Sequence, residues 1–162
     1  VNGLEIEALS NVNDSLSINY GLTLLDATYG EFLNTNGIQP ELGDQQLDGN
    51  YLTNAPKVSI NLGLNYTSAM SSGGSLTYRA NAAYKSRIYF SEFNEYSQDA
   101  YTILDLNLIW ESADETMRSR FFVKNATDED YIAGYLSSAT GGGRFGQWGY
   151  PRTVGIEIQR NF

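Results

Sequence analysis

Cysteine and histidine are both absent from the 162 residues of this chain. Their absence excludes disulfide frameworks, thiolate and imidazole metal sites, and the Ser-His-Asp and Cys-His pairs of nucleophilic enzymes. The sequence also has no run of about 18 apolar residues that could span a membrane as a helix. Its formal charge of -9 argues against nucleic acid as a partner, because phosphates require a basic surface. We therefore expect no catalytic residues, no cofactor and no metal site.

Tyrosine and glycine are plentiful, with 12 and 16 residues, which favours β structure with many turns. The closing stretch, residues 152–162, alternates strictly. Val154, Ile156 and Ile158 point one way, polar residues point the other way, and the chain ends on Phe162. This pattern predicts a strand whose apolar face touches lipid. The last strand of a soluble β-sandwich would alternate in the same manner, so that alternative stays open here.

Six further segments are predicted to be strands, most of them from the same period-two alternation. They cover residues 4–8, 16–24, 58–67, 76–88, 104–110 and 118–126. Leu76 to Ile88 places its apolar residues on one face, whereas Phe121-Phe122-Val123 leaves the sixth segment without an obvious polar face.

The connections between these segments differ in length in a regular way. They are short near residues 12, 72 and 114, and long at about 30–55, 91–99 and 133–150. Since consecutive antiparallel strands alternate direction, all short turns fall at one end and all long loops at the other, as in bacterial outer-membrane barrels. A sandwich has no physical reason to sort its loops. Complete bacterial barrels have even strand counts, so seven strands predict that more barrel precedes Val1.

Four phrases in order carry a family resemblance. They are N-A-P-K at 54–57 followed by N-L-G-L-N-Y at 61–66, S-Q-D-A-Y at 97–101, F-V-K-N-A-T-D-E-D-Y at 122–131, and P-R-T-V-G at 151–155 leading to the terminal Phe162. Together they span nearly the whole chain. The sequence resembles the C-terminal part of TonB-dependent outer-membrane receptors.

The resemblance implies an all-β fold, an antiparallel transmembrane β-barrel of about 22 strands. Residues 1–162 would form its C-terminal third, with the plug domain and the earlier strands absent. The implied function is import of a small-molecule ligand, such as an iron–siderophore complex, by energy-coupled transport. The implied location is the outer membrane of a Gram-negative bacterium, with the lipid bilayer and, through the plug, the TonB complex as partners.

The resemblance also implies that the outer-membrane assembly machinery recognises the closing strand. Its assembly signal would comprise Val154, Ile156, Ile158 and Phe162. Arg160 departs from the family pattern, which usually has an aromatic residue two positions before the terminal Phe. Either the signal is weaker here, or the Arg160 side chain extends to the lipid headgroups.

The candidate ligand or lumen-facing residues are Arg79, Lys85, Arg87 and Asp105. The three cations are odd-numbered on one predicted strand and so share its polar face. They could attract an anionic ligand. We favour the alternative that they neutralise acidic neighbours, since pairing with the next strand is expected to place Lys85 or Arg87 near Asp105.

Tyr66, Tyr78 and Trp110 lie on the predicted apolar face near short turns. We expect them to form an aromatic girdle at the membrane boundary; in a sandwich they would fill the core. The alternative function is accordingly a secreted soluble β-sandwich that binds carbohydrate on tyrosine-rich loops. A small self-contained outer-membrane barrel is a third hypothesis, against which the odd strand count argues.

Three local motifs suggest chemistry only weakly. Gly141-Gly142-Gly143-Arg144 lacks the Lys-Ser/Thr of a phosphate loop, and Asp44 and Asp48 lack the spacing of an EF-hand. Residues 128–130, with three consecutive acids, could bind a cation, but we interpret them as a strand-end motif.

Overall fold

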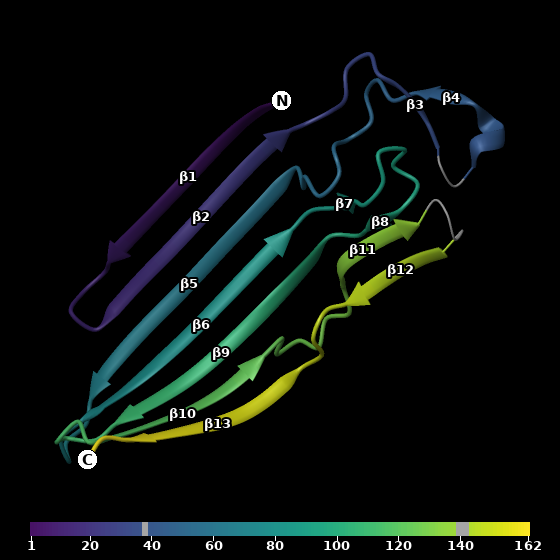
Figure 1. Ribbon diagram of the computed structural model, residues 1–162. Coiled ribbons are helices and arrows are strands. Elements are labelled where there is room, and N and C mark those ends of the chain that lie inside the picture. Colours follow the sequence, from purple (N-terminus) through teal and green to yellow (C-terminus); the bar gives the residue numbers. More distant parts are fainter. Residues whose placement is uncertain (37–38, 139–142) are drawn as a thin grey trace.

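The computed structural model describes residues 1–36, 39–138 and 143–162 and is built almost entirely of β-strands. Seven long strands form one antiparallel sheet in which each strand pairs with the next long strand along the chain (Figure 1). They are β1 (Asn2–Asn11), β2 (Leu16–Asp26), β5 (Val58–Ala69), β6 (Ser75–Lys85), β9 (Tyr101–Glu111), β10 (Met117–Lys124) and β13 (Thr153–Arg160). All seven predicted strands are confirmed.

The register of the sheet places all the apolar residues of the alternating pattern on one face. Leu62, Ala82 and Leu104 oppose one another across β5, β6 and β9. Even-numbered residues form this face from β1 to β9. The parity changes in β10, where Phe121 opposes Leu108 on one side and Ile156 on the other.

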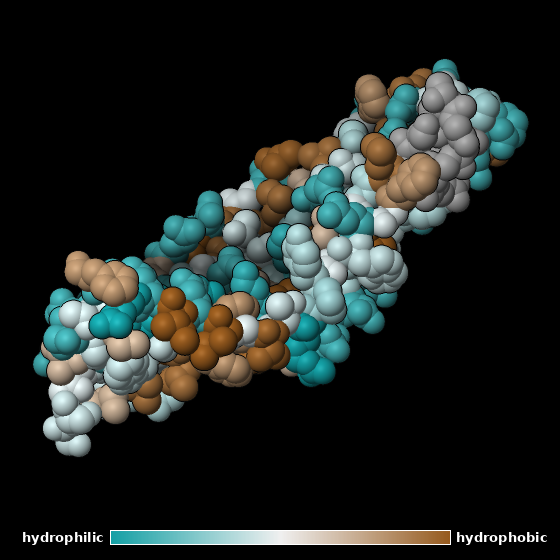
Figure 2. All heavy atoms as spheres, turned by 60° about the horizontal axis from the view of Figure 1, so that its bottom comes forward, coloured by the Kyte–Doolittle hydropathy of each residue, from teal (hydrophilic) through white to brown (hydrophobic). Residues whose placement is uncertain are grey.

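The apolar face has no covering layer in the described part of the chain. Leu62 is 50% exposed and Ile156 is 69% exposed. Figure 2, which turns the β13 side of the sheet forward, shows hydrophobic residues gathered in a band beside a mixed, largely hydrophilic surface. A β-sandwich would cover such a face with a second sheet. An aliphatic face of this extent requires an apolar surrounding.

The short connections lie at one end of the sheet and the long ones at the other, as predicted (Figure 1). The N-terminus lies at the long-connection end and the C-terminus at the short-turn end. Each long connection contains a small hairpin. These pair β3 (Leu33–Thr35) with β4 (Asp44–Gln46), β7 (Ile88–Tyr89) with β8 (Ser97–Gln98), and β11 (Ile132–Ser138) with β12 (Gly143–Trp148). The 3₁₀ turn η1 (Pro40–Leu42) lies within the first connection.

Two of the differences from the predicted boundaries affect the long connections. The segment 133–150, expected to be a glycine-rich loop, contains most of β11 and all of β12. The fourth strand ends at Lys85 rather than at Ile88. There Ser86 Oγ accepts the Val58 backbone N–H at 3.0 Å, and Ile88 is buried at 7% exposure in β7 instead of facing outward.

Most of the buried side chains lie at the long-connection end of the molecule. Leu47 is 1% exposed and Ala27 is 3% exposed, and Ile88 and Tyr101 are also buried. The sheet itself has little interior, with Thr77 and Ile109 as a buried pair across β6 and β9. The protein is therefore a thin wall of strands joined to a packed body of loops.

The sequence of β10 shows no obvious polar face, and a contact of Phe122 with β13 explains why. Phe122 lies on the polar face opposite Gly155, and a Cβ at position 155 would fall 2.3 Å from its ring. Only glycine fits there. The Arg120 guanidinium lies over the Phe122 ring, 4.9 Å from its centroid, so a charged group covers the aromatic ring on the polar face of the wall.

Candidate functional site

The polar face of the wall carries the cations predicted from the sequence. Arg79 lies opposite Asn65 and Asn107, and its Nε donates to Asn65 Oδ1 at 2.8 Å. Lys85 lies at the last position of β6, opposite Tyr101. Both side chains therefore face the same side of the sheet, in two different rows.

The expected approach of Lys85 or Arg87 to Asp105 is wrong. Asp105 opposes Asn81, four residues below Lys85, and its Oδ1 accepts the backbone N–H of Asn125 at 2.9 Å. The register could not be inferred because β6 and β9 are joined by a long connection with its own hairpin, and such a connection does not fix which residues meet.

Arg87 lies beyond β6 and forms an ion pair within that connection. Its Nη2 and Nε both donate to Asp99 Oδ1, at 2.7 Å and 3.0 Å. Asp99, followed by the Tyr89 hydroxyl, raises the pKa of the Arg87 guanidinium above its ordinary value. The side chains of Arg87 and Asp99 are 57% and 79% exposed, so the pair is largely solvated. Arg87 is therefore paired with an acidic residue, as the neutralising role predicts, but that residue is Asp99 rather than Asp105.

Two further ion pairs on the wall had not been predicted. Arg118 Nε lies 3.5 Å from Glu111, and Arg120 Nη1 lies 3.4 Å from Glu157. Both join neighbouring strands across β9, β10 and β13. The alternation of arginine and serine in 118–120 was the available signal, and the aromatic run that follows concealed it.

Asn125 is a buried junction between the wall and the loops that sequence analysis also missed. It is 3% exposed and has a positive φ of 47°. Its Nδ2 donates to the carbonyls of Glu129 and Tyr150 at 2.9 Å and 3.1 Å, and its Oδ1 accepts the Glu129 N–H at 2.9 Å. The asparagine of the F-V-K-N-A-T-D phrase therefore closes the end of β10 against the entry to β13.

The acidic residues that follow have a structural partner. Asp128 Oδ1 accepts the backbone N–H of Arg152 at 2.8 Å, and Asp128 Oδ2 lies 3.5 Å from the Arg152 guanidinium. Among the described residues, no group of three or more potential metal-ligating side chains occurs. Part of the Gly141–Arg144 motif lies outside the described residues.

The long connections are tied to one another by side-chain hydrogen bonds. Asn94 Oδ1 accepts the Tyr51 N–H at 2.7 Å, and Asn94 Nδ2 donates to the Tyr51 carbonyl at 2.9 Å. Asn50 Nδ2 donates to the Glu92 carbonyl at 3.0 Å. The third connection joins through Gln98 Oε1, which accepts the Ile132 N–H at 2.9 Å. The three connections therefore form one body.

Stacked aromatic rings reinforce this loop body. Tyr135 stacks with both Phe90 and Tyr96 at centroid distances of 5.5 Å. Tyr101 stacks on Tyr131 at 4.8 Å, where the loops meet the wall. Stacked aromatic rings of this kind suit capture of a ligand that has flat or aromatic parts.

The predicted girdle residues are brought together on the apolar face. Tyr66 opposes Tyr78 with ring centroids 6.2 Å apart, and the two are 41% and 46% exposed. Trp110 lies one row nearer the short turns, opposite Leu76. This cluster occupies the short-turn end of the apolar face.

The closing strand keeps its apolar residues on the outer face. Val154, Ile156 and Ile158 are 58%, 69% and 65% exposed. The Arg160 guanidinium lies over the ring of Phe162 at 5.0 Å. One edge of β13 pairs with β10, and no other described strand pairs with its second edge.

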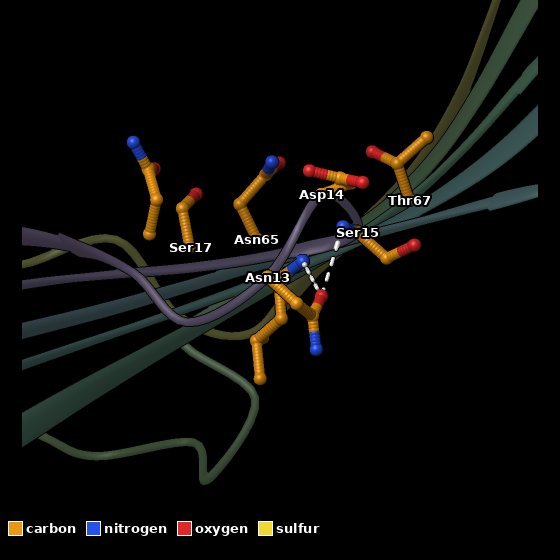
Figure 3. A pocket seen from close by; sticks show the side chains of 8 residues that line it. Asn13, Asp14, Ser15, Ser17, Asn65 and Thr67 are labelled. Atoms are coloured by element: carbon orange, nitrogen blue, oxygen red, sulfur yellow. Dashed lines mark hydrogen bonds between the residues drawn. The ribbon is translucent and has the colours of Figure 1, made fainter.

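A polar pocket of about 430 Å³ lies beside the turn between β1 and β2 (Figure 3). Asn65 and Thr67 of β5 and Ser17 of β2 line it together with the turn residues. Asn13 Oδ1 shapes the turn by accepting the N–H groups of Ser15 and Leu16, both at 2.9 Å. The amide and hydroxyl groups that line the pocket can form hydrogen bonds with water or with a peptide backbone.

Comparisons with known proteins identify the family. The family model described as TonB dependent receptor-like, beta-barrel, matches residues 1–126. No curated protein sequence matches the chain. No helix among the described residues has the length and apolar character needed to cross a membrane.

Three solved structures share the fold. The ferric yersiniabactin uptake receptor FyuA from Yersinia pestis has a TM-score of 0.79 and 22% identity, with 99% of this chain and 23% of that one covered. BauA, the ferric preacinetobactin receptor from Acinetobacter baumannii, has a TM-score of 0.78 and 21% identity over 99% and 22%.

The siderophore receptor PiuA from Acinetobacter baumannii has a TM-score of 0.77 and 18% identity over 96% of this chain and 21% of that one. The chain thus spans less than a quarter of the length of these three structures. A single wall of seven strands, the sorted connections and the family match lead to one conclusion: the chain belongs to the TonB-dependent receptor β-barrel family.

Proposed function

We propose that this chain is the C-terminal part of the barrel of an outer-membrane receptor that imports an iron–siderophore complex by energy-coupled transport. The observation that carries the proposal is the division of one sheet into an uncovered aliphatic face and a polar face, with all long loops at one end. Membrane barrels require this division, because lipid lies on one side and a polar interior on the other.

In this proposal each region of the wall has a role. The aliphatic face lies against lipid, with Tyr66, Tyr78 and Trp110 as the girdle near the periplasmic boundary. The polar face, with Arg79, Lys85 and Asp105, lines the lumen and contacts the plug or the passing ligand. The loop body lies outside the cell and captures ligand through its aromatic rings and Arg87.

The family match supports the proposal of two further partners. Transport would be driven through the TonB complex, which engages a plug that residues 1–162 do not contain. The assembly machinery would recognise β13 through Val154, Ile156, Ile158 and Phe162. The chain supplies wall, loops and lumen surface, and no residue of it is assigned a catalytic role.

Spin labels on adjacent residues of β5 test the orientation of the wall. Leu62→Cys and Asn61→Cys place labels on opposite faces at nearly the same depth, and the chain has no native cysteine. In the full-length protein in bilayers, made cysteine-free elsewhere, the label at 62 should collide with dissolved oxygen and the label at 61 with a water-soluble nickel chelate. Equal accessibility of both labels to the chelate would refute the membrane wall.

Uptake measurements test the ligand class. Radiolabelled ferric yersiniabactin and ferric preacinetobactin are suitable probes, because the neighbours FyuA and BauA are receptors for these complexes. Tyr135→Ala should lower uptake of a transported probe about tenfold by removing two ring contacts. The matched control Tyr78→Ala removes a tyrosine from the lipid face and should leave uptake unchanged. If both variants take up the probe equally, the stacked rings of Phe90, Tyr96 and Tyr135 are not part of the binding site.

A further inference from the structure

The β7–β8 hairpin presents both rings that meet Tyr135 in the loop body. Its ladder pairs Gln98 with Ile88, and two residues further along the Phe90 N–H donates to the Tyr96 carbonyl at 2.9 Å. Phe90 and Tyr96 each stack with Tyr135 at a centroid distance of 5.5 Å. Because side chains two residues apart on a strand share a face, Gln98 lies on the face that carries the rings.

The neighbouring strand β11 is tied to this hairpin at its first residue (Figure 1). The Gln98 Oε1 accepts the Ile132 N–H at 2.9 Å. Tyr135 follows three residues later, about 10 Å further along the strand at about 3.3 Å per residue. One amide oxygen therefore holds the start of β11 beside the rings that its tyrosine reaches.

The pairing of β11 with β12 does not fix this position by itself. The register of the pair shifts between Ile132 and Gly134, and a shift of this kind bends a strand and redirects the side chains beyond it. The residue before β11 is held separately. The Tyr131 ring stacks on Tyr101 at 4.8 Å, and a Cβ at Gly149 would fall 2.1 Å from that ring. The hydrogen bond at Ile132 therefore lies between a clamped base and an irregular ladder, where it sets the direction of β11.

The amide group of Gln98 also reaches the ion pair of the second connection. Its Nε2 donates to the Asp99 carbonyl at 3.1 Å, and the Asp99 carboxylate is the partner of Arg87. An apolar side chain at position 98 would leave the partly buried Ile132 N–H without this acceptor, which costs free energy. Gln98 thus joins the ring stack to the Arg87–Asp99 pair, and the proposed function assigns ligand capture to both.

We propose that Gln98 is a positioning residue for ligand capture: by accepting the Ile132 N–H, it places the Tyr135 ring against the rings of Phe90 and Tyr96. Gln98 acts through Tyr135 rather than on the ligand. The inference rests on the proposed function, which takes the stack as a ligand contact, but the placement of the ring can be measured without any ligand. It also gives a function to the second residue of the S-Q-D-A-Y phrase at 97–101.

Fluorine NMR of the full-length protein in detergent tests the placement of the ring. A para-fluorophenylalanine incorporated at position 135 senses the ring currents of its neighbours, and Phe90→Ala gives the signal of a ring that has lost one of them. Gln98→Met, which has no comparable acceptor, should move the signal toward that value. Gln98→Glu keeps an acceptor oxygen and should leave the signal in place. An unmoved signal in Gln98→Met, or equal movement in both variants, overturns the proposal.

The first connection offers a matched control of the same residue type. Gln46 Oε1 accepts the Phe32 N–H at 2.7 Å, so Gln46→Met removes the same kind of hydrogen bond from a different connection. It should leave the fluorine signal at position 135 unchanged. Movement as large as that of Gln98→Met would mean that any loosened loop displaces the ring, and would overturn the specific role of Gln98. Each variant is counted only if it keeps the heat-modifiable gel mobility of a folded barrel.

Binding of radiolabelled ferric yersiniabactin and ferric preacinetobactin to cells treated with a proton uncoupler tests the consequence for capture. For a probe that binds, Gln98→Met should raise the Kd about tenfold, the factor expected for one lost hydrogen bond, and Gln98→Glu should keep the wild-type Kd. The uptake rate at saturating probe in energised cells should be unchanged. A loss of that rate as large as the loss of affinity would overturn a positioning role.

The two measurements separate the possible failures. If the ring signal moves as expected but the Kd of a bound probe does not change, the placement stands and the stack is not a ligand contact, so the proposed route of capture fails. If Tyr135→Ala lowers uptake while Gln98→Met changes neither the ring signal nor the Kd, only this inference fails. The ring signal decides the role of Gln98 even if neither probe binds.

Discussion

Leu47 in the first long connection is 1% exposed, whereas Leu62 in β5 is 50% exposed, although both are leucines of the same chain. In the loop body, side chains are buried away from water in a small core, and hydrogen bonds join one connection to the next. The wall is ordered by its strand ladder and exposes its aliphatic residues. This contrast agrees with the proposed membrane orientation, in which the loop body lies in water and the aliphatic face of the wall lies against hydrocarbon.

The largest expected effect comes from removing the loop core. Leu47→Ala should destabilise the first connection by ~2–5 kcal/mol, because it removes a fully buried side chain and leaves a cavity. Hydrogen exchange should report it as lost amide protection in residues 27–57, with β5 and β6 unchanged. Ile158→Ala, at a 65% exposed wall position, is the matched control and should leave this protection intact. Unchanged protection in the Leu47 variant would show that the loops have no core.

A charge on the wall tests the other side of the contrast. Leu62→Lys should destabilise the protein in bilayers by up to ~2–4 kcal/mol, the cost of a lysine facing hydrocarbon, and less if this row lies near the boundary. Asn61→Lys, one residue away on the polar face, should cost much less. Urea unfolding of the full-length protein in vesicles measures both. Equal destabilisation by the two lysines would mean that the two faces of the wall do not lie against different solvents.

Asn125 tests the junction of the two regions. Asn125→Ala should cost ~1–3 kcal/mol, because the Glu129 N–H and the Tyr150 carbonyl lose their buried partner. The control is Asn13→Ala, which removes an asparagine from an exposed short turn and should cost less. Thermal unfolding in detergent compares them. A smaller loss for Asn125 than for Asn13 would contradict its role as a junction.

The contrast also explains what could be predicted from the sequence. The wall was predictable because a strand between lipid and a polar interior must alternate, and a shift by one residue would exchange its faces. The predicted approach of Lys85 to Asp105 was wrong because their strands are joined by a long connection. The alternation of each strand fixes the face on which a residue lies, but a long connection does not fix which residues are opposite each other. The Asn125 junction depends on contacts with Glu129, Tyr150 and Asp105, and the last two are distant in sequence, so no local pattern defines them.

The smallest effect is expected at the short turn between β9 and β10, which belongs to neither the loop core nor the wall. Asp114 Oδ1 accepts hydrogen bonds from Ser112 Oγ at 2.6 Å, from Thr116 Oγ1 at 2.9 Å and from the Thr116 N–H at 3.2 Å. The Ser112 hydroxyl, followed by Thr116, holds the pKa of Asp114 below its ordinary value of 3.8. A carboxylate with a depressed pKa stabilises the folded state above its unfolded pKa, and this contribution is lost as the pH falls through the folded pKa.

Asp114→Asn keeps an acceptor oxygen in this turn but removes the titration. The stability of the wild-type protein relative to this variant should therefore be constant above about pH 5 and should decline below pH 3.8. The difference should also shrink with added salt, because the carboxylate is exposed. Unfolding midpoints of both proteins between pH 2 and pH 6 measure it. A difference independent of pH would mean that the turn does not hold the carboxylate in its charged form, and that short turns of this wall are set by backbone geometry alone.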